Sequence, residues 1–258
     1  MNQFLKSISN QLEKDNSDYI YNILKIENFS SSNSRLRFWY NHCKNNFDSI
    51  EGDIFEFGVF QGTSIISMAI LLKKLGSKKT IYGFDSFEGF PRFHKNDSIS
   101  MFETKSNHFS VEHRNHVKNL SLLEKQFSNI KKSDTAFSSN FSDSKFDILK
   151  KKIDLLGLDN IILVKGDFKD TIPPFFKNFD NSIFSINIDC DLYEGYKLVF
   201  ENTWNLLNHK SYIHLDEYYS LRYPGARIAT DDFLKNKLQK PFKQQTPIGE
   251  FERWGILK

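Results

Sequence analysis

The sequence predicts an α/β fold with a mostly parallel sheet and helices on both faces. Strand-like and helix-like runs alternate from residue 53 onward, and this order is typical of parallel sheets. Acidic residues stand at the ends of the predicted strands, where such sheets bind ligands. With 258 residues, 39% of them hydrophobic, the chain can bury one sizeable core. We therefore expect a single domain over residues 1–258.

The first part of the chain predicts two strands behind a helical opening. One or two amphipathic helices are expected within the N-terminal segment 1–49. A strand over residues 53–57 is followed by a glycine turn and a helix from about residue 63 to residue 75, which Gly76 ends. A second strand ends at Asp85.

Residues 93–140 are rich in Ser, Asn, Lys and His, and they predict a polar insertion that acts as a mobile lid. A helix is expected over residues 111–127, because its apolar residues fall on one face. Its neighbouring histidines do not have the spacing of a zinc site, so we interpret them as part of a solvated helix face: His108, His113 and His116.

Three further strands and a closing pair follow the insertion. A helix capped by Ser142 is expected to run to Leu156 and to stop at Gly157. The third strand ends at Asp167, the fourth at Asp189, and the fifth at Asp216 and Glu217, with a helix over residues 196–207 before the fifth. The tail, residues 241–258, predicts two short strands.

Composition excludes several classes of protein. The net charge of +3 is slight and the lysines are scattered, which argues against a nucleic-acid partner. Cys43 and Cys190 are too few for a disulfide framework, which fits a reducing compartment. We find no signal peptide and no apolar run of the ~20 residues that span a bilayer, so a cytoplasmic location is expected.

The stretch "SINIDCDLYEGY" places Asp189 and Asp191 at the tip of an apolar strand. Two carboxylates so close repel each other, so they either lie in water or enclose a cation. Asp216 and Glu217 end the neighbouring strand, and carboxylates converging from two strand ends suit Mg²⁺ or a similar divalent ion. Solvated loop acids are the alternative for any single pair. Cys190 is interpreted as a small packed side chain.

Other strand ends predict a site for a nucleoside. Gly58 and Gly62 allow a tight turn and close backbone approach, although their spacing is not that of a dinucleotide-binding fingerprint. Asp85 can accept both hydroxyls of a ribose. Asp167 can accept from an exocyclic amino group, with Phe168 stacking on a purine. No phosphate cradle is evident, which favours a nucleoside without phosphates.

Five blocks, in order, resemble the macrocin O-methyltransferase (TylF-like) family: "GDIFEFGVFQGTS", "GFDSFEGFP", "GDFKDTIP", "IDCDLYEGY" and "DEYYSLRYPGARIATDDF". The resemblance runs from about residue 50 to residue 233. It implies a Rossmann-like class I methyltransferase fold with a mostly parallel seven-stranded sheet. It also implies an enzyme that uses S-adenosylmethionine and Mg²⁺ to methylate a sugar hydroxyl, and it favours a homo-oligomer.

The resemblance also implies roles for single residues. It implies metal ligation by Asp189, Asp216 and Glu217, with Asp191 as the general base. Cofactor contacts are implied at Glu56, Gly58, Gly62, Thr63, Asp85, Ser86, Asp167 and Phe168.

The chain departs from the family's usual pattern at three places. Glu217 stands where a second aspartate is usual, and Gln61 stands where Arg is frequent. "NHKSY" replaces the paired glycines before the fifth strand.

Two other functions are compatible with the sequence. An Asp-x-Asp motif after an apolar strand is also typical of metal-dependent glycosyltransferases, but that function leaves the glycine turn and the pair Asp216–Glu217 unexplained. A non-catalytic homologue that only binds the cofactor is the third possibility. For the methyltransferase, the acceptor is expected to be a small molecule or glycan: a polysaccharide, a sugar nucleotide or a glycosylated natural product.

Overall fold

In the computed structural model, which describes residues 22, 24–29, 31–32, 34–127, 141–247 and 249–258, seven strands form one sheet. Their order is β3-β2-β1-β4-β5-β7-β6. The strands are β1 (Asp53–Phe57), β2 (Ile81–Asp85), β3 (Ile161–Lys165), β4 (Ile183–Ile188), β5 (Leu207–Leu215), β6 (Phe242–Lys243) and β7 (Trp254–Leu257). Strands β1 to β5 are parallel, and β7 runs antiparallel to β5 and β6. The predicted sheet, with its closing pair of strands, is confirmed.

The central strands are apolar because both of their faces are covered. Every residue of β4 is buried, and so are residues 54–57 of β1. Continuous burial of this kind is typical of parallel strands with helices on both sides. Strand β3 at the edge is only partly buried, with Ile162 exposed.

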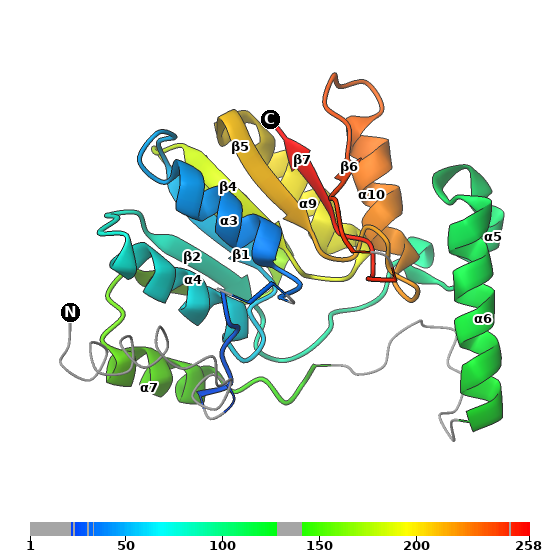
Figure 1. Ribbon diagram of the computed structural model, residues 1–258, viewed down its shortest axis with the longest axis horizontal. Helices are drawn as coiled ribbons and strands as arrows, with labels where there is room; N and C mark the ends of the chain where they lie inside the picture. Colours follow the sequence, from blue (N-terminus) through cyan, green and yellow to red (C-terminus); the bar gives the residue numbers. More distant parts are fainter. Residues whose placement is uncertain (1–21, 23, 30, 33, 128–140, 248) are drawn as a thin grey trace.

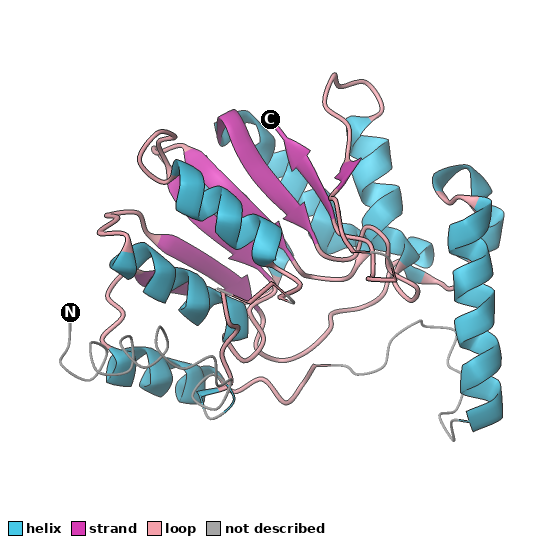
Figure 2. Cartoon of the chain, in the orientation of Figure 1, coloured by secondary structure: helices cyan, strands magenta, loops and turns pink. Residues whose placement is uncertain are grey.

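Helices cover the sheet in two layers (Figures 1 and 2). One face carries α3 (Arg37–Asn46), α4 (Thr63–Lys74) and α7 (Phe146–Leu156), which share one apolar cluster. The other face carries α8 (Phe168–Lys177), α9 (Tyr193–Thr203), the short η3 (Trp204–Leu206) and α10 (Pro224–Leu234), which share a second cluster. The expected layers are therefore confirmed.

The polar insertion is largely helical where it is described. It contains η1 (Lys95–Asp97), α5 (Met101–Thr104), η2 (Ser106–His108) and α6 (Val111–Phe127), and α6 stands at one side of the molecule (Figure 1). Phe102, Phe109 and Val117 pack with Ile228 of α10 in a small apolar cluster. The predicted helix over residues 111–127 is confirmed. Residues 128–140 of the expected lid lie outside the described chain.

Two helices were not expected from the sequence, and one begins later than expected. Helix α8 contains Pro173 and Pro174, which normally interrupt a helix, but it buries an apolar face on the sheet. Helix α10 begins with a proline at its first turn, a favourable position. Ser142 does not cap α7, because that helix starts at Phe146; its end at Gly157, in the left-handed conformation, is as predicted.

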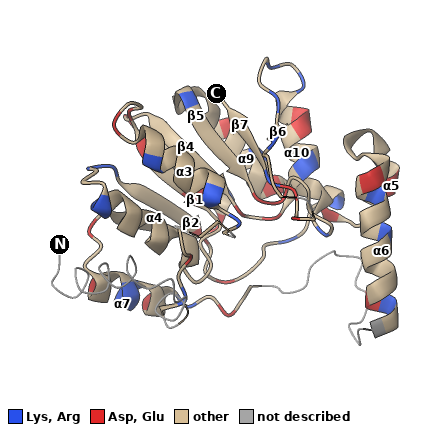
Figure 3. Cartoon of the chain, viewed as in Figure 1, with Lys and Arg blue, Asp and Glu red and all other residues tan. Residues whose placement is uncertain are grey.

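Charges are distributed without a basic face. Lys and Arg are spread over α3, α4, α6, α7 and α10, with acidic residues between them (Figure 3). In the described part of the chain, no helix combines the length and the apolar character needed to cross a bilayer.

Candidate active site

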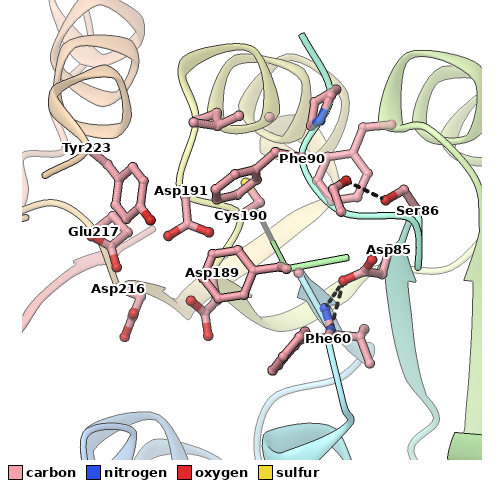
Figure 4. A pocket seen from close by; sticks show the side chains of 18 of the residues that line it. Phe60, Asp85, Ser86, Phe90, Asp189, Cys190, Asp191, Asp216, Glu217 and Tyr223 are labelled. Carbon is pink, nitrogen blue, oxygen red and sulfur yellow. Dashed lines mark hydrogen bonds between the residues drawn. The ribbon is translucent and has the colours of Figure 1, made fainter. Parts of the chain in front are cut away.

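The carboxyl ends of the parallel strands open into one cavity of about 1040 Å³ (Figure 4). The five acidic residues predicted at the strand ends all line it: Asp85, Asp167, Asp189, Asp216 and Glu217. They come from the ends of β2, β3, β4 and β5. The five residues therefore share one cavity, at the sheet edge where the sequence predicts them. A cavity of this size can hold two small ligands side by side.

Two glycines shape the turn beside the cavity, and of these Gly58 lines the cavity whereas Gly62 does not. Gly58 has φ +94°, and a Cβ atom there would lie 1.9 Å from the carbonyl oxygen of Asp189. Gly62 has φ +80°, and its Cβ would lie 2.2 Å from Leu149 Cδ1. Both positions need glycine for conformation and for space. The turn leads directly into α4, so the N-terminus of that helix, with Thr63, faces the cavity.

Asp85 binds the backbone of the glycine turn and also lines the cavity. Its Oδ2 accepts hydrogen bonds from the backbone N–H groups of Val59 and Phe60, both at 2.8 Å. Its Oδ1 accepts from the N–H of Phe87 at 2.6 Å. A carboxylate has about four acceptor positions, so Oδ1 retains one for a ribose hydroxyl. Asp85 thus braces the glycine turn as well as facing the cavity; Ser86 beside it also lines the cavity.

Glu56 lies beneath the turn rather than on the cavity wall. Its side chain is fully buried, and Oε1 accepts hydrogen bonds from the Ser64 hydroxyl and from Asn187 Nδ2, the latter at 3.2 Å. Burial raises the pKa of Glu56 to about 8, against the effect of the Ser64 hydrogen bond. Glu56 is thus not among the residues that line the cavity, and its buried Oε2 accepts no hydrogen bond; the cofactor contact that the resemblance implies stays a prediction.

Asp167 and Phe168 form another part of the wall. Asp167 is the N-cap of α8, and its Oδ1 accepts a hydrogen bond from the N–H of Lys169 at 3.0 Å. The ring of Phe168 contacts Phe57 edge-on, with centroids 6.0 Å apart. Both residues line the cavity, as expected.

Backbone hydrogen bonds bring the acidic strand ends together. The N–H of Asp189 donates to the carbonyl of Phe57, and the N–H of Asp216 donates to the carbonyl of Ile188. The buried hydroxyl of Tyr196 donates to the same Ile188 carbonyl and accepts from the N–H of Glu217, at 2.9 and 3.1 Å. The register of β1, β4 and β5 therefore fixes the acidic cluster.

The acidic cluster has the geometry of a cation site. One ligand atom each from Asp189, Asp216 and Glu217 lies within 4.8 Å of the others. The guanidinium of Arg35 lies against two of them, with Nη2 at 2.6 Å from Asp189 Oδ2 and Nη1 at 2.5 Å from Asp216 Oδ1. Burial acts to raise the pKa of Asp216, but Arg35 and then His214 outweigh it and hold that pKa well below its ordinary value. Burial, followed by the charge of Asp216, raises the pKa of Glu217 to about 8.

Asp191 lines the same cavity beside Glu217, but it is not one of the three residues whose ligand atoms converge (Figure 4). Its backbone has φ +62°, a left-handed conformation that few residue types other than Gly, Asn and Asp adopt. Burial, and then the charge of Glu217, raises its pKa well above the ordinary value. The neighbouring Cys190 is a free thiol that packs against the second apolar cluster, as predicted.

Of the three histidines interpreted as a solvated helix face, His116 is exposed as expected, whereas the interpretation is wrong for His113. His113 is fully buried, and its Nε2 donates to the carbonyl oxygen of Ser220 at 2.7 Å. The other two also bind the region that follows β5: His108 Nδ1 lies 3.0 Å from Asp231 Oδ2, and His116 Nδ1 lies 3.1 Å from the Tyr219 hydroxyl. These contacts dock the insertion onto the segment that carries the acidic pair.

Sequence reasoning missed two features of the site. No sequence pattern around Arg35 indicates its place in the site, because its partners lie more than 150 residues away in the chain. An aromatic surface crosses the cavity: the ring centroids of Phe60 and Phe141 are 5.3 Å apart, those of Phe141 and Phe90 are 4.9 Å apart, and those of Phe90 and Tyr223 are 6.0 Å apart. The sequence is rich in aromatic residues, many of which lie in the core, so nothing in it distinguished these three phenylalanines and one tyrosine.

Comparisons with known proteins identify the family and the fold of the chain. The macrocin-O-methyltransferase (TylF) family model matches residues 34–253. A structure of CalS11, a calicheamicin methyltransferase, has a TM-score of 0.62 and 20% identity, and the match covers 97% of this chain and 90% of that one. Apo CalS11, described as a TDP-rhamnose 3'-O-methyltransferase, has a TM-score of 0.52 and 19% identity, covering 97% and 91%. The O-methyltransferase NovP has a TM-score of 0.57 and 18% identity, covering 84% and 78%.

At these identities the solved structures establish the fold, and no curated protein matches the sequence. The family model extends beyond the predicted blocks at both ends and covers most of the chain. The chain therefore belongs to the macrocin O-methyltransferase (TylF) family and is an S-adenosylmethionine-dependent O-methyltransferase.

Proposed function

We propose that this enzyme methylates a sugar hydroxyl and that it depends on Mg²⁺ or a similar divalent cation. The observation that carries the proposal is the convergence of Asp189, Asp216 and Glu217 to within 4.8 Å in the cavity that also contains the glycine turn. In a methyltransferase, a cation site beside the cofactor site is where an acceptor hydroxyl would bind.

The residues present fit a divalent cation. All three candidate ligands are carboxylates, the hard oxygen donors that Mg²⁺ prefers. Asp216 Oδ1 is buried and accepts no hydrogen bond, although Arg35 lies close to it. Asp191 and Glu217 form no ion pair among the described residues, so Arg35 leaves these two carboxyl groups without an ionic partner. When bound, a divalent cation would supply Lewis-acid polarisation of the acceptor hydroxyl.

Asp191 is the proposed general base. Methyl transfer forms a bond between the acceptor oxygen and the methyl carbon while the carbon–sulfur bond breaks, and the hydroxyl proton must leave. The Asp191 carboxylate lines the cavity outside the proposed ligand set, so it is available to accept that proton.

The cavity supports a sugar-containing acceptor. The aromatic surface of Phe60, Phe90, Phe141 and Tyr223 offers ring faces and edges, which pack well against sugar rings, while carboxylates nearby can accept from hydroxyls. CalS11, by its description, acts on TDP-rhamnose. We propose an acceptor from three groups: a glycan, a sugar nucleotide or a glycosylated natural product.

The test combines binding and turnover. S-Adenosylhomocysteine should raise the melting temperature, whereas UDP with Mn²⁺ should not. A panel of sugar nucleotides and glycosides should then reveal methyl transfer that stops with a chelator and returns with Mg²⁺. If methyl transfer proceeds at the same rate with and without the chelator, the proposed dependence on a divalent cation is contradicted. Cofactor binding without transfer to any member of a broad panel would favour a non-catalytic homologue.

A further inference from the structure

Arg35 bridges two of the three carboxylates of the acidic cluster. Its two terminal nitrogens contact different carboxylates, Asp189 on β4's end and Asp216 on β5's end, at 2.6 and 2.5 Å. Within the described chain, no other Lys or Arg forms an ion pair with either of them. A planar guanidinium suits this bridging position because its fork of donors can serve two carboxylates at once.

A divalent cation and this guanidinium compete for the same carboxylates. Mg²⁺ binds oxygen ligands at about 2.0–2.1 Å, so an ion among Asp189, Asp216 and Glu217 would lie within a few ångströms of the Arg35 nitrogens. Like charges at that separation repel strongly away from bulk water. Binding of the ion therefore requires Arg35 to leave.

The side chain of Arg35 can leave while its backbone stays in place. On one side, the Ser34 hydroxyl donates to Glu27 Oε1 at 2.6 Å and accepts from the N–H of Leu36, which is fully buried. On the other side, α3 begins at Arg37, which binds both carboxylate oxygens of Glu250 at 2.6 and 2.9 Å. The Arg35 side chain lines the cavity and is 36% exposed, so it can rotate toward the cavity.

We propose that Arg35 is a built-in competitor of the divalent cation: guanidinium and metal ion are alternative occupants of the acidic cluster, and their exchange is a rotation of one side chain. This inference rests on the divalent cation site proposed above. Arg35 then neutralises part of the cluster before the ion binds, and it lowers the enzyme's affinity for the ion.

The experiment measures Mn²⁺ binding by the full chain, using the loss of the free Mn²⁺ signal in electron paramagnetic resonance. Arg35→Met should bind Mn²⁺ roughly 10- to 100-fold more tightly than the wild type, since the ion no longer breaks two charge-assisted contacts. Arg35→Lys should lie between them, because an ammonium group is a point charge that cannot reproduce the fork. Arg114→Met removes a guanidinium on α6 that donates to the carbonyl of Phe109, and it should bind Mn²⁺ like the wild type.

Two further readouts separate competition from a merely structural role. Methylguanidinium at millimolar concentration should weaken Mn²⁺ binding by Arg35→Met and leave the wild type unaffected. Mn²⁺ should also raise the melting temperature of Arg35→Met more than that of the wild type, because the variant has uncompensated carboxylates. If Arg35→Met folds poorly, the Mn²⁺ affinity of Arg35→Lys, which keeps a positive charge in the site, is compared with that of the wild type instead.

The outcomes distinguish this inference from the proposed function. If the wild type binds Mn²⁺ and both Arg35 variants bind it equally or more weakly, the cation site stands and the competition is refuted. If neither the wild type nor any variant binds Mn²⁺, the cation is removed from the proposed function and the competition is refuted with it.

Discussion

The carbonyl oxygen of Asp189 lies 1.9 Å from the position that a Cβ atom of Gly58 would take. The end of β4 therefore packs directly on the turn that follows β1, with no room for any side chain between them. Because Asp189 is a proposed ligand and Gly58 belongs to the expected cofactor turn, this contact couples the two halves of the site.

Gly58→Ala should consequently disturb both halves at once. Gly76→Ala is the matched control, since Gly76 also has a positive φ, +67°, but has open space around it. Both variants incur the cost of the left-handed backbone, and only Gly58→Ala adds a steric clash. We expect Gly58→Ala to lose about 1–3 kcal/mol more in free energy of unfolding. Chemical denaturation would measure this, and equal losses would contradict the contact.

Asp85→Ala should weaken S-adenosylmethionine binding by about 1.5–3 kcal/mol if Asp85 contacts the ribose. It should also destabilise the fold, because three backbone N–H groups lose their acceptor. Asp53→Ala is the comparison: it removes the acceptor of the backbone N–H of Thr80, but Asp53 does not line the cavity, so cofactor affinity should stay unchanged. Calorimetry and thermal unfolding separate the two effects. If Asp85→Ala binds the cofactor with unchanged affinity, Asp85 has no ribose contact and serves only to hold the glycine turn in place.

Asp189→Asn and Asp191→Asn should have different defects. Asp189→Asn should weaken Mg²⁺ binding and lose activity that high Mg²⁺ partly restores, since Asp189 is a proposed ligand. Asp191→Asn should keep metal and cofactor affinity and lose roughly 10²–10⁴-fold in turnover, the usual scale for a general base. Asn tolerates the left-handed backbone at position 191, so the fold should survive.

Metal titration and methyl transfer, measured on both aspartate variants side by side, decide between the roles. If Asp191→Asn loses the metal and Asp189→Asn keeps it, the assigned roles are reversed. If neither variant affects transfer, the reaction takes place elsewhere.

Stability should fall in acid partly because of His113. Burial lowers the pKa of this histidine from 6.5 to about 4, with a smaller opposing effect from its hydrogen bond to Ser220. Arg227 Nη1, 3.4 Å from its other ring nitrogen, also disfavours the charged form. Between these pKa values the unfolded chain binds more protons than the folded one, so stability is full above about pH 6.5 and falls as the pH drops toward 4.

His113→Gln should therefore lessen the loss of unfolding free energy between about pH 7.5 and about pH 5 by about 2 kcal/mol. Denaturant titration at the two pH values measures it. The exposed His209 provides a matched control, and His209→Gln should keep the full pH dependence. An identical slope in His113→Gln and the wild type would show that His113 is accessible to protons in the folded state.

The sequence predicted those strands and helices whose formation follows from the residues within the segment itself. The apolar runs of β1 and β4 were readable because helices cover both faces of these strands and require apolar residues throughout. The extent of α6 was readable from its helical spacing, although Leu123 of its predicted apolar face is exposed. The acidic strand ends were predictable as a group because parallel strands place their carboxyl ends at one edge. Helix α8 was not, because packing on the sheet outweighs the effect of its two prolines.

Contacts between distant residues could not be predicted. Arg35 joins the cluster only once α3 packs beside β4 and β5. His113 looks like any polar helix residue until the loop after β5 covers it. Asp85 was expected to face a ligand, yet its three hydrogen bonds to backbone amides depend on how two loops meet.

The left-handed backbone at Asp191 also has an evolutionary consequence. Only a few residue types adopt that conformation without a penalty, chiefly Gly, Asn and Asp. A lineage that abandons catalysis while keeping the fold would most easily do so through Asn or Gly at this position, since bulkier replacements also strain the chain. With Asp191 as the proposed base, Asn or Gly at this position is thus expected in relatives that have become binding proteins, and Asp in those still selected for turnover.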